Sequence, residues 1–497
     1  MYRDNQKQLK FEDFYLPFGG RLRSDNRWVK LAKLIPWHEF EELYASSLAG
    51  TGMGAPAMSV RVALGALIIK ERLGTSDEET VEQIRENPYL QYFLGLEEYG
   101  EEAPFHPTMF VHFRKRLGKE ALRAINDRIS TKAMSSGEKP KQKGKKLSGK
   151  DDDQGPPSGT SQGGNQGKLL LDASCAPADI TYPTDLKIVN EAREKSEEII
   201  DALHEPAKGK KRKPRTYRQK ARKQFLAAAK KKKLSKRQRR QVMRQQLGYL
   251  ARNLKTISSL ANQHGLGLLD RRQYKNLLVI EEVRRQQKSM FENKANRIED
   301  RIVSISQPHV RPIKRGKAGA STEFGAKISV SVINGYGFVD RLSWDSYNES
   351  GDLIAQVKKY RQLFGCWPES VHADKIYRNQ ENRRFCKKHG IRLSGPPLGR
   401  PPKDAQISRE IRKQVYQDEV ERNAVEGKFG QAKRRFGLGR VMCKLASTAE
   451  TAVLITFLVM NLERWLKAIL FWLFYNLLIL SQIGSPLQGR PGLCTEI

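Results

Sequence analysis

The stretch "EFGAKISVSVINGYGFVDRLSWD", residues 323–345, decides the fold class. On both sides of Asn334-Gly335 its apolar residues alternate with polar ones, which is the period of two expected of extended strands. An Asn-Gly pair between two such runs is a strong signal for a tight hairpin turn. We therefore predict a β-hairpin here, following a segment whose apolar residues repeat at helical spacing.

The segments after the hairpin alternate between helix and strand. "SGDLIAQVKKYRQLFG" (350–365) and "NQENRRFCKKHG" (379–390) have helical patterns, while "ESVHAD" (369–374) and "IRLSGPP" (391–397) are typical of strands. A long helix is expected after the Gly- and Pro-rich "GPPLGRPP". Together with the apolar run at 169–171, this order predicts a mixed α/β sheet with helices packed on it.

The N-terminal segment, residues 1–133, is predicted to be helical. One helix stops at Gly74, the next carries the capping pattern Ser76 with Glu79, and Thr108 is expected to cap "MFVHFRKRLG". Arg114 and Arg116 would then belong to a cationic helix face. Short helices ending in a basic one suit either a helix-turn-helix-like DNA-binding and dimerisation unit or an ordinary helical bundle with solvated charges.

Charge separates the rest of the chain into further parts. The net charge is +35, and residues 207–244 contain no acid and are about half Lys or Arg, so a polyanionic partner is indicated. We expect a flexible linker at 134–167, a basic helical insertion at 186–305, and a core formed by 168–185 and 306–445. The C-terminal part, 446–497, contains the apolar run 468–480, predicted to be a helix packed on protein, with an interfacial membrane helix as the alternative.

Five scattered cysteines without a C-x-x-C pair favour reduced thiols, and the charged N-terminus lacks the apolar region of a signal peptide. A cytoplasmic, nucleoid-associated protein with no membrane contact is the expectation.

Three acids fall where such a sheet would gather them. Asp172 is predicted to end the strand that begins at Leu169, Asp374 to end a later strand, and Glu426 to lie on the last long helix. Acids brought together repel unless a cation lies between them. Oxygen ligands without His or Cys favour Mg²⁺ or Mn²⁺, and two such ions can promote displacement at phosphorus. The structural alternatives are strand-end caps for the aspartates and an i,i+4 ion pair between Arg422 and Glu426.

Arg422, Glu426 and Lys433 share one helix face, which suits a metal-binding acid flanked by phosphate-binding cations. Alternative acids, ranked lower because less apolar or turn-like runs precede them, are Asp179, Asp185, Asp340 and Asp345.

Four stretches together resemble a known family: "LLLDASCAPADITYPTD", "VRPIKRGKAGASTEFGAKISVSVINGY", "ADKIYRNQENRRFCKKHGI" and "RNAVEGKFGQAKRRFGLGRV". They are similar to bacterial insertion-sequence transposases of the DDE class, in the IS-five-like group. The last stretch resembles the R-x₃-E-x₆-K signature of that group. Where the family has a Tyr three positions before the Arg, this chain has Glu419, and the basic insertion is a departure in size.

The resemblance implies an RNase H-like catalytic core with Asp172, Asp374 and Glu426 as the metal-binding triad. It implies that Arg422 and Lys433 contact DNA near the transposon end, with Arg315, Lys317 and Lys327 as further phosphate contacts.

The implied reaction is cleavage at inverted-repeat ends and transfer of the 3′-OH to target DNA. The implied partner is double-stranded DNA, bound by a homodimer or higher oligomer. The rival hypotheses are an RNase H-like nuclease that cuts without joining, and a non-catalytic nucleic-acid-binding protein derived from a transposase.

Overall fold

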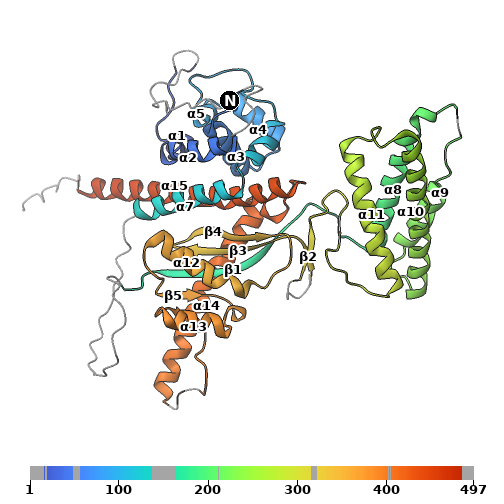
Figure 1. Cartoon of the computed structure of the whole chain (residues 1–497). Coiled ribbons are helices and arrows are strands. Elements are labelled where there is room, and N and C mark those ends of the chain that lie inside the picture. Colours follow the sequence, from blue (N-terminus) through green and yellow to red (C-terminus); the bar gives the residue numbers. More distant parts are fainter. Residues whose placement is uncertain are drawn as a thin grey trace, which may run out of the picture.

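A computed structural model describes residues 16, 20–48, 56–136, 164–210, 212–314, 322–400, 402 and 404–483. The molecule consists of an N-terminal group of helices, a mixed sheet with helices on it, and a separate helical unit to one side (Figure 1).

A six-stranded sheet forms the centre of the molecule. It has the order β2-β3-β1-β5-β6, and β4 also pairs with β3. The pairs β1–β3, β2–β3 and β3–β4 are antiparallel, whereas β1–β5 and β5–β6 are parallel. The strands are β1 Lys168–Pro177, β2 Arg311–Lys314, β3 Thr322–Ile333, β4 Tyr336–Ser343, β5 Ser370–His372 and β6 Arg392–Leu393. The predicted mixed α/β fold class is confirmed.

The hairpin predicted from Asn334-Gly335 joins β3 to β4. Both turn residues have positive φ, 49° for Asn334 and 80° for Gly335, as a two-residue turn matching the twist of the strands requires.

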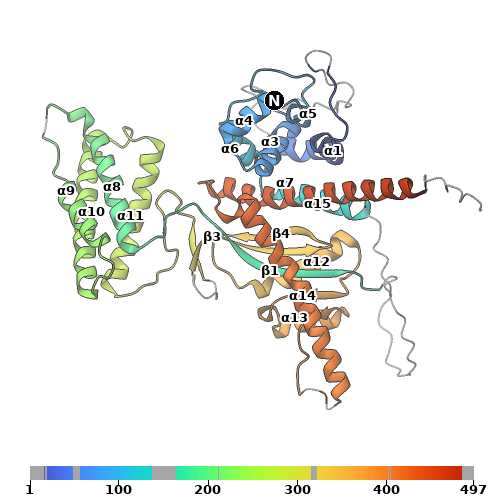
Figure 2. The ribbon, with the colours of Figure 1, turned by 180° about the vertical axis from the view of Figure 1, so that it is seen from behind.

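Helices cover both faces of the sheet and link it to the N-terminal group. α14 (Ala405–Arg435) crosses the face seen in Figure 2. The long helix α15 (Ala446–Ile483) runs with α7 (Lys119–Ser136) between the sheet and the N-terminal helices (Figure 1). The other helices of these two parts are α1 Arg27–Leu34, α2 His38–Ala45, α3 Val60–Leu73, α4 Asp77–Glu86, α5 Pro88–Leu94, α6 Met109–Arg116, α12 Leu353–Phe364 and α13 Gln380–Lys388.

Between β1 and β2 the chain leaves the sheet and forms the separate helical unit. Its helices are α8 Asp185–His204, α9 Arg218–Ala229, α10 Lys236–His264 and α11 Arg271–Glu292. They enclose an apolar core of their own, with Val189, Leu203, Leu250 and Ile280 fully buried. The sequence between two sheet strands therefore folds around a second hydrophobic core.

Two local expectations were wrong. β1 does not end at Asp172 but continues to Pro177, because antiparallel pairing with β3 extends as far as Pro177 opposite Gly325. Thr108 does not cap α6 with its side chain: its own backbone is helical, and its hydroxyl lies 2.9 Å from His106 Nδ1. By contrast, the Ser76 hydroxyl accepts a hydrogen bond from the Glu79 N–H, and α3 ends at Gly74, as predicted.

The C-terminal apolar run 468–480 lies within α15. Up to Leu466 this helix is largely buried, but Leu470 and Phe471 are exposed, so the predicted packing on protein does not extend over the start of the run. Side chains beyond Phe471 lie outside the described residues. Within the described part of the chain, no helix is long and apolar enough to span a membrane.

Candidate active site

Asp172 lies within β1, and Asp374 follows the end of the neighbouring parallel strand β5. The register of β1 and β5 ends with Leu170 opposite His372, and each aspartate comes two residues later. Adjacent strands lie roughly 5 Å apart, and extending this register by two residues would set Asp374 opposite Asp172. β5 has ended there, and the Asp374 carboxylate accepts a hydrogen bond from the Lys375 N–H at 2.6 Å, capping a short 3₁₀ turn. Asp374 is exposed.

Asp172 belongs to the sheet face that α14 covers. Lys168 forms an ion pair with Glu421 of α14 at 2.7 Å, and Asp172 shares the face of Lys168 because alternate strand residues point the same way. On β5, the His372 ring lies 3.7 Å from Asp418 and 3.6 Å from Glu421. α14 therefore also covers the face of β5 that bears His372, two residues before Asp374.

The Asp172 carboxylate is in a crowded acidic environment. Burial raises its pKa to about 6, and the negative charges of Glu349 and Glu426 act in the same direction. The Ala173 N–H, 2.8 Å from the carboxylate, and the Arg422 guanidinium oppose this rise. Such an arrangement makes Asp172 a strong candidate for binding a cation.

Glu349 was missed by the sequence reasoning. It stands in a 3₁₀ turn, Glu349–Asp352, after β4, where the sequence carries no strand-end or helical signature for a site acid. Its nearness to Asp172 comes only from the tertiary fold.

Glu426 is near Asp172 but is paired. Its carboxylate lies 3.1 Å from Arg422, so the i,i+4 ion pair weighed as the structural alternative is present. The Glu426 side chain is 56% exposed, which leaves it free to exchange this partner for another. Lys433 is half-buried two turns further along α14.

The oxygen atoms that these acids offer are of the kind that bind Mg²⁺ or Mn²⁺. Asp172 and Asp374 offer carboxylate oxygens alone, which is what these ions prefer. Within the described residues, however, no group of three or more His, Cys, Asp or Glu side chains is arranged to hold a metal ion. Glu426 stays paired with Arg422.

Two of the predicted DNA-binding cations form ion pairs with acidic side chains of the same chain. Lys327 lies 2.6 Å from Glu349 and also donates to the Tyr347 carbonyl. Arg114 is buried and donates from both terminal nitrogens to Asp77, at 2.6 and 3.1 Å. The expectation that Arg114 contributes to a cationic surface of α6 is therefore wrong. The sequence did not indicate this ion pair because Asp77 lies 37 residues from Arg114. Half-buried Arg116 lies beside Tyr44 and opposes the rise that burial causes in the tyrosine pKa. Arg315 and Lys317 lie outside the described residues.

The alternative acids have structural partners. Asp179 pairs with Arg440 at 2.5 Å, Asp185 with Arg301 at 2.5 Å, and Asp340 with Lys359 at 3.4 Å. Asp345 is 76% exposed and lies 3.9 Å from Arg311. The first three contacts join elements of the fold, whereas the exposed Asp345 contributes little to stability.

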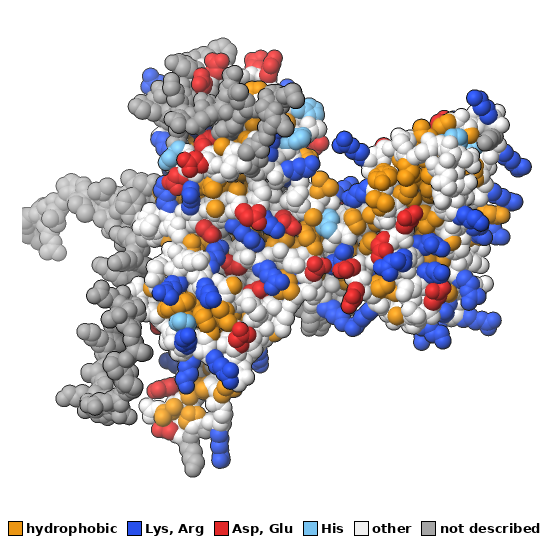
Figure 3. Space-filling model, viewed as in Figure 1, with side chains coloured by type: hydrophobic (Ala, Val, Ile, Leu, Met, Phe, Trp, Pro, Cys, Tyr) orange, Lys and Arg blue, Asp and Glu red, His pale blue; other side chains and the backbone are white. Residues whose placement is uncertain are grey.

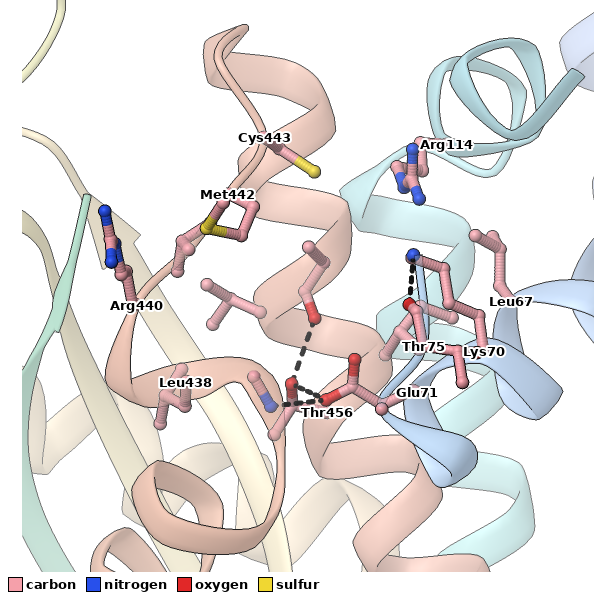
Figure 4. Close-up of a pocket in the computed structure, with 16 residues that line it drawn as sticks. Leu67, Lys70, Glu71, Thr75, Arg114, Leu438, Arg440, Met442, Cys443 and Thr456 are labelled. Carbon is pink, nitrogen blue, oxygen red and sulfur yellow. Dashed lines mark hydrogen bonds between the residues drawn. The ribbon is translucent and has the colours of Figure 1, made fainter. Parts of the chain in front are cut away.

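A cavity of about 200 Å³ lies away from the aspartates, between α3, residues 437–443 and α15 (Figure 4). Within it, the Glu71 carboxylate accepts hydrogen bonds from the Thr456 hydroxyl and the Gly437 N–H. Burial raises the Glu71 pKa. This cavity marks the junction between the N-terminal helices and the sheet-bearing part.

Two parts of the chain match family models. Residues 371–463 match "Transposase DDE domain", a range that contains Asp374 and Glu426 but not Asp172. Residues 17–116, which span α1 to α6, match "Transposase domain (DUF772)".

A relative in Rhizobium meliloti, described as the uncharacterized protein ORF8 in the nfe locus, is 28% identical over 160 residues. That match covers 32% of this chain and 66% of the relative. No solved structure matches the chain.

Proposed function

We propose that the chain cleaves and joins DNA at the ends of a bacterial insertion sequence, because two of its parts match transposase family models. The observation that supports the proposal is that Asp172 and Asp374 each come two residues after Leu170 and His372, the last paired residues of the neighbouring strands β1 and β5.

In this proposal Asp172 and Asp374 hold the divalent ions, and Glu426 joins them when its pairing with Arg422 is exchanged. Mg²⁺ or Mn²⁺ bound there would supply Lewis-acid catalysis of displacement at phosphorus. The crowding of Asp172 by Glu349 and Glu426 supports a cation at this place, since a positive charge relieves the repulsion among the three carboxylates.

Arg422 is positioned to act on DNA. It lies on α14 next to both Glu426 and Asp172, so a phosphodiester reaching the aspartates meets its guanidinium. Guanidinium groups bind phosphate oxygens in a bidentate manner, so Arg422 would orient the scissile phosphate while releasing Glu426. Lys433, further along the same helix, would contact the backbone beyond the cleavage point.

The proposed reaction has two displacements at one site. Water attacks the phosphorus at the element's end, the bond to the 3′ oxygen breaks, and a 3′-OH and a 5′-phosphate result. The 3′-OH then attacks a target phosphodiester, so one phosphodiester bond forms as another breaks. A dimer or higher oligomer would bring two ends together.

The test uses the full chain, a labelled duplex carrying the element's own inverted repeat, and Mg²⁺ or Mn²⁺. We expect wild type to cut at the repeat boundary and Asp374→Asn to bind without cutting, while the exposed-acid control Asp345→Asn cuts normally. Cutting without joining to a target duplex would indicate a nuclease. Binding without cutting by the wild type would contradict catalysis and favour a DNA-binding protein derived from a transposase.

A further inference from the structure

We propose that the helical unit α8–α11 carries a second DNA-binding surface, formed by α10, by α9 and by the segment that precedes α9, which holds the phosphate backbone of duplex DNA away from Asp172 and Asp374. The inference takes its DNA partner from the proposed function, but it concerns a different surface and requires no catalysis.

The charge of this surface is one-sided. Between Pro206 and Leu269 the sequence has 21 Lys and Arg and no Asp or Glu. Among the described residues of this stretch, ion pairs are formed by Lys208, Lys213 and Arg218, with acids of α8 or the turn after it. The other described cations have no acidic partner, so they repel one another until a polyanion neutralises them.

Part of this charge converges on a groove of about 530 Å³ beside α10. Four cations line it, and no acid does. They are Arg212, Arg215, Arg252 and Lys255. Thr256, Ser259 and Gln263 add neutral hydrogen-bonding groups to its wall. A concave site with convergent cations and hydroxyl donors is suited to phosphate oxygens.

Two of the three guanidinium groups in this groove lie over aromatic rings. Arg252 lies 5.1 Å from the centre of the Tyr217 ring and 4.9 Å from that of Tyr249, and Arg215 lies 4.7 Å from Tyr217. The Tyr249 hydroxyl is bonded to Gln224 at 3.0 Å, which fixes that ring in turn. The two arginines are thus positioned before any ligand arrives.

These contacts favour duplex over single-stranded nucleic acid. Proteins bind single strands by stacking bases on open aromatic faces. Here guanidinium groups lie over the faces of Tyr217 and Tyr249, so the groove presents cations. A surface that offers charge without stacking faces is suited to the backbone of a double helix, whatever its sequence.

The surface faces away from the proposed catalytic site. In Figures 1 and 2, α9 and α10 lie on the side of the helical unit remote from the sheet, and α11 lies nearer to it. Figure 3 shows Lys and Arg side chains gathered along that outer edge. α10 is 29 residues long, which corresponds to about 43 Å of helix. We therefore assign to this surface a DNA segment other than the one being cut.

The experiment measures binding of the full chain to a 30-base-pair duplex of arbitrary sequence over a range of salt concentrations. The background carries Asp374→Asn, so cleavage plays no part. The groove variant combines Arg212→Gln, Arg215→Gln, Arg252→Gln and Lys255→Gln. We expect about a 10- to 100-fold loss of affinity near 0.1 M salt, and a slope of log K against log salt that is shallower by about 3.

A matched control removes the same number of charges from α11, with Arg271→Gln, Arg272→Gln, Arg284→Gln and Lys288→Gln. The control should lose much less affinity, and circular dichroism should show both variants folded. A second variant, Arg215→Lys with Arg252→Lys, keeps the charge and should keep most of the salt slope.

Equal losses in groove and control variants would overturn the proposal, because net charge alone would then explain binding. Tighter binding of a single strand than of the duplex would also overturn it. The same holds if the groove variant loses binding to anionic vesicles while its binding to the duplex is unchanged. If the wild type fails to cut its inverted repeat while the groove variant still loses duplex affinity, the proposed catalysis fails and this inference stands.

Discussion

Asp418 of α14 accepts hydrogen bonds from both terminal nitrogens of Arg392 on β6, at 2.6 and 2.9 Å. Asp418 is buried, and His372 of β5 lies beneath it, with its Nδ1 3.7 Å from the carboxylate. Burial favours the protonated acid, but the hydrogen bonds from Arg392 and Gln414 hold the Asp418 pKa below its usual range. This cluster sets the position of α14, and hence of Glu426, on the strands that bear the two aspartates.

We expect Asp418→Asn to lower the free energy of unfolding by about 2 kcal/mol, since it removes the charge partner of Arg392, which is partly exposed. The rate of DNA cleavage by this variant should fall by a larger factor than its folded fraction, because α14 is less well positioned. Its binding to DNA should persist. Thermal unfolding and cleavage rates test this, with Glu410→Gln on the exposed part of α14 as control. Unchanged cleavage by a folded Asp418→Asn protein would contradict a positioning role.

A second buried contact joins α7, β4 and α15. The amide nitrogen of fully buried Asn461 donates to Asn126, Ser130 and the Gly337 carbonyl, and its oxygen accepts from the Gly337 N–H at 2.9 Å. Asn461→Leu removes the acceptor of the Gly337 N–H and the amide donor to Asn126 and Ser130, so we expect a loss of about 3 kcal/mol in unfolding free energy. Chemical denaturation measures it. The exposed Asn262→Leu on α10 should change stability by less than about 0.5 kcal/mol. Similar values for both variants would show that the network contributes little.

His309 gives the protein a defined acid sensitivity. Burial lowers its pKa to about 4, assisted by Lys275 and Arg311, and its ring packs edge-on against Trp344. The folded state therefore holds His309 neutral, whereas the unfolded chain protonates it near pH 6.5. Its contribution to stability is fully present above that pH and is lost as the pH falls through about 4.

We expect wild type to lose roughly 2 kcal/mol more than His309→Gln between pH 7.5 and pH 4.5. Denaturant unfolding of both proteins at the two pH values gives the difference in unfolding free energy. The contributions of other titrating groups are the same in both proteins and cancel. The exposed His112→Gln should follow the wild type. A His309→Gln protein with the full acid loss would show that another group is responsible.

Local sequence signals predicted those parts of the fold whose cause is local. Asn334-Gly335 fixes the β3–β4 turn through its backbone angles, and Gly74 ends α3 in the left-handed conformation. By contrast, the length of β1 depends on pairing with β3, some 150 residues later, so Asp172 was wrongly expected to end its strand. The neighbouring strand β5, by contrast, ends at His372, shortly before Asp374.

The same distinction holds at the candidate site. Apolar runs before Asp172 and Asp374 were enough to select both acids, and each comes two residues after the last paired residues of β1 and β5. The charge partners were not predictable, because Asp77 neutralises Arg114 and Glu349 neutralises Lys327 only through tertiary contacts. A cationic residue in the sequence is therefore a weak guide to a DNA contact.

The Arg422–Glu426 pair allows a structural role to be separated from a functional one. An i,i+4 pair with a Glu that is 56% exposed contributes only a few tenths of a kcal/mol. Arg422→Gln should therefore leave the melting temperature nearly unchanged. If Arg422 orients the scissile phosphate, the same substitution should slow DNA cleavage by at least about 10-fold, whereas binding of a long duplex changes little.

Single-turnover cleavage of the inverted-repeat duplex and a thermal melt measure the two effects on one preparation. Arg409→Gln, an exposed arginine near the start of α14, is the matched control for loss of charge and should cleave normally. Arg422→Lys keeps the charge without the planar fork, and we expect it to recover only part of the rate. Normal cleavage by Arg422→Gln would mean that the ion pair is the whole role of Arg422. Loss of cleavage with an unchanged melt would support its contact with the phosphate.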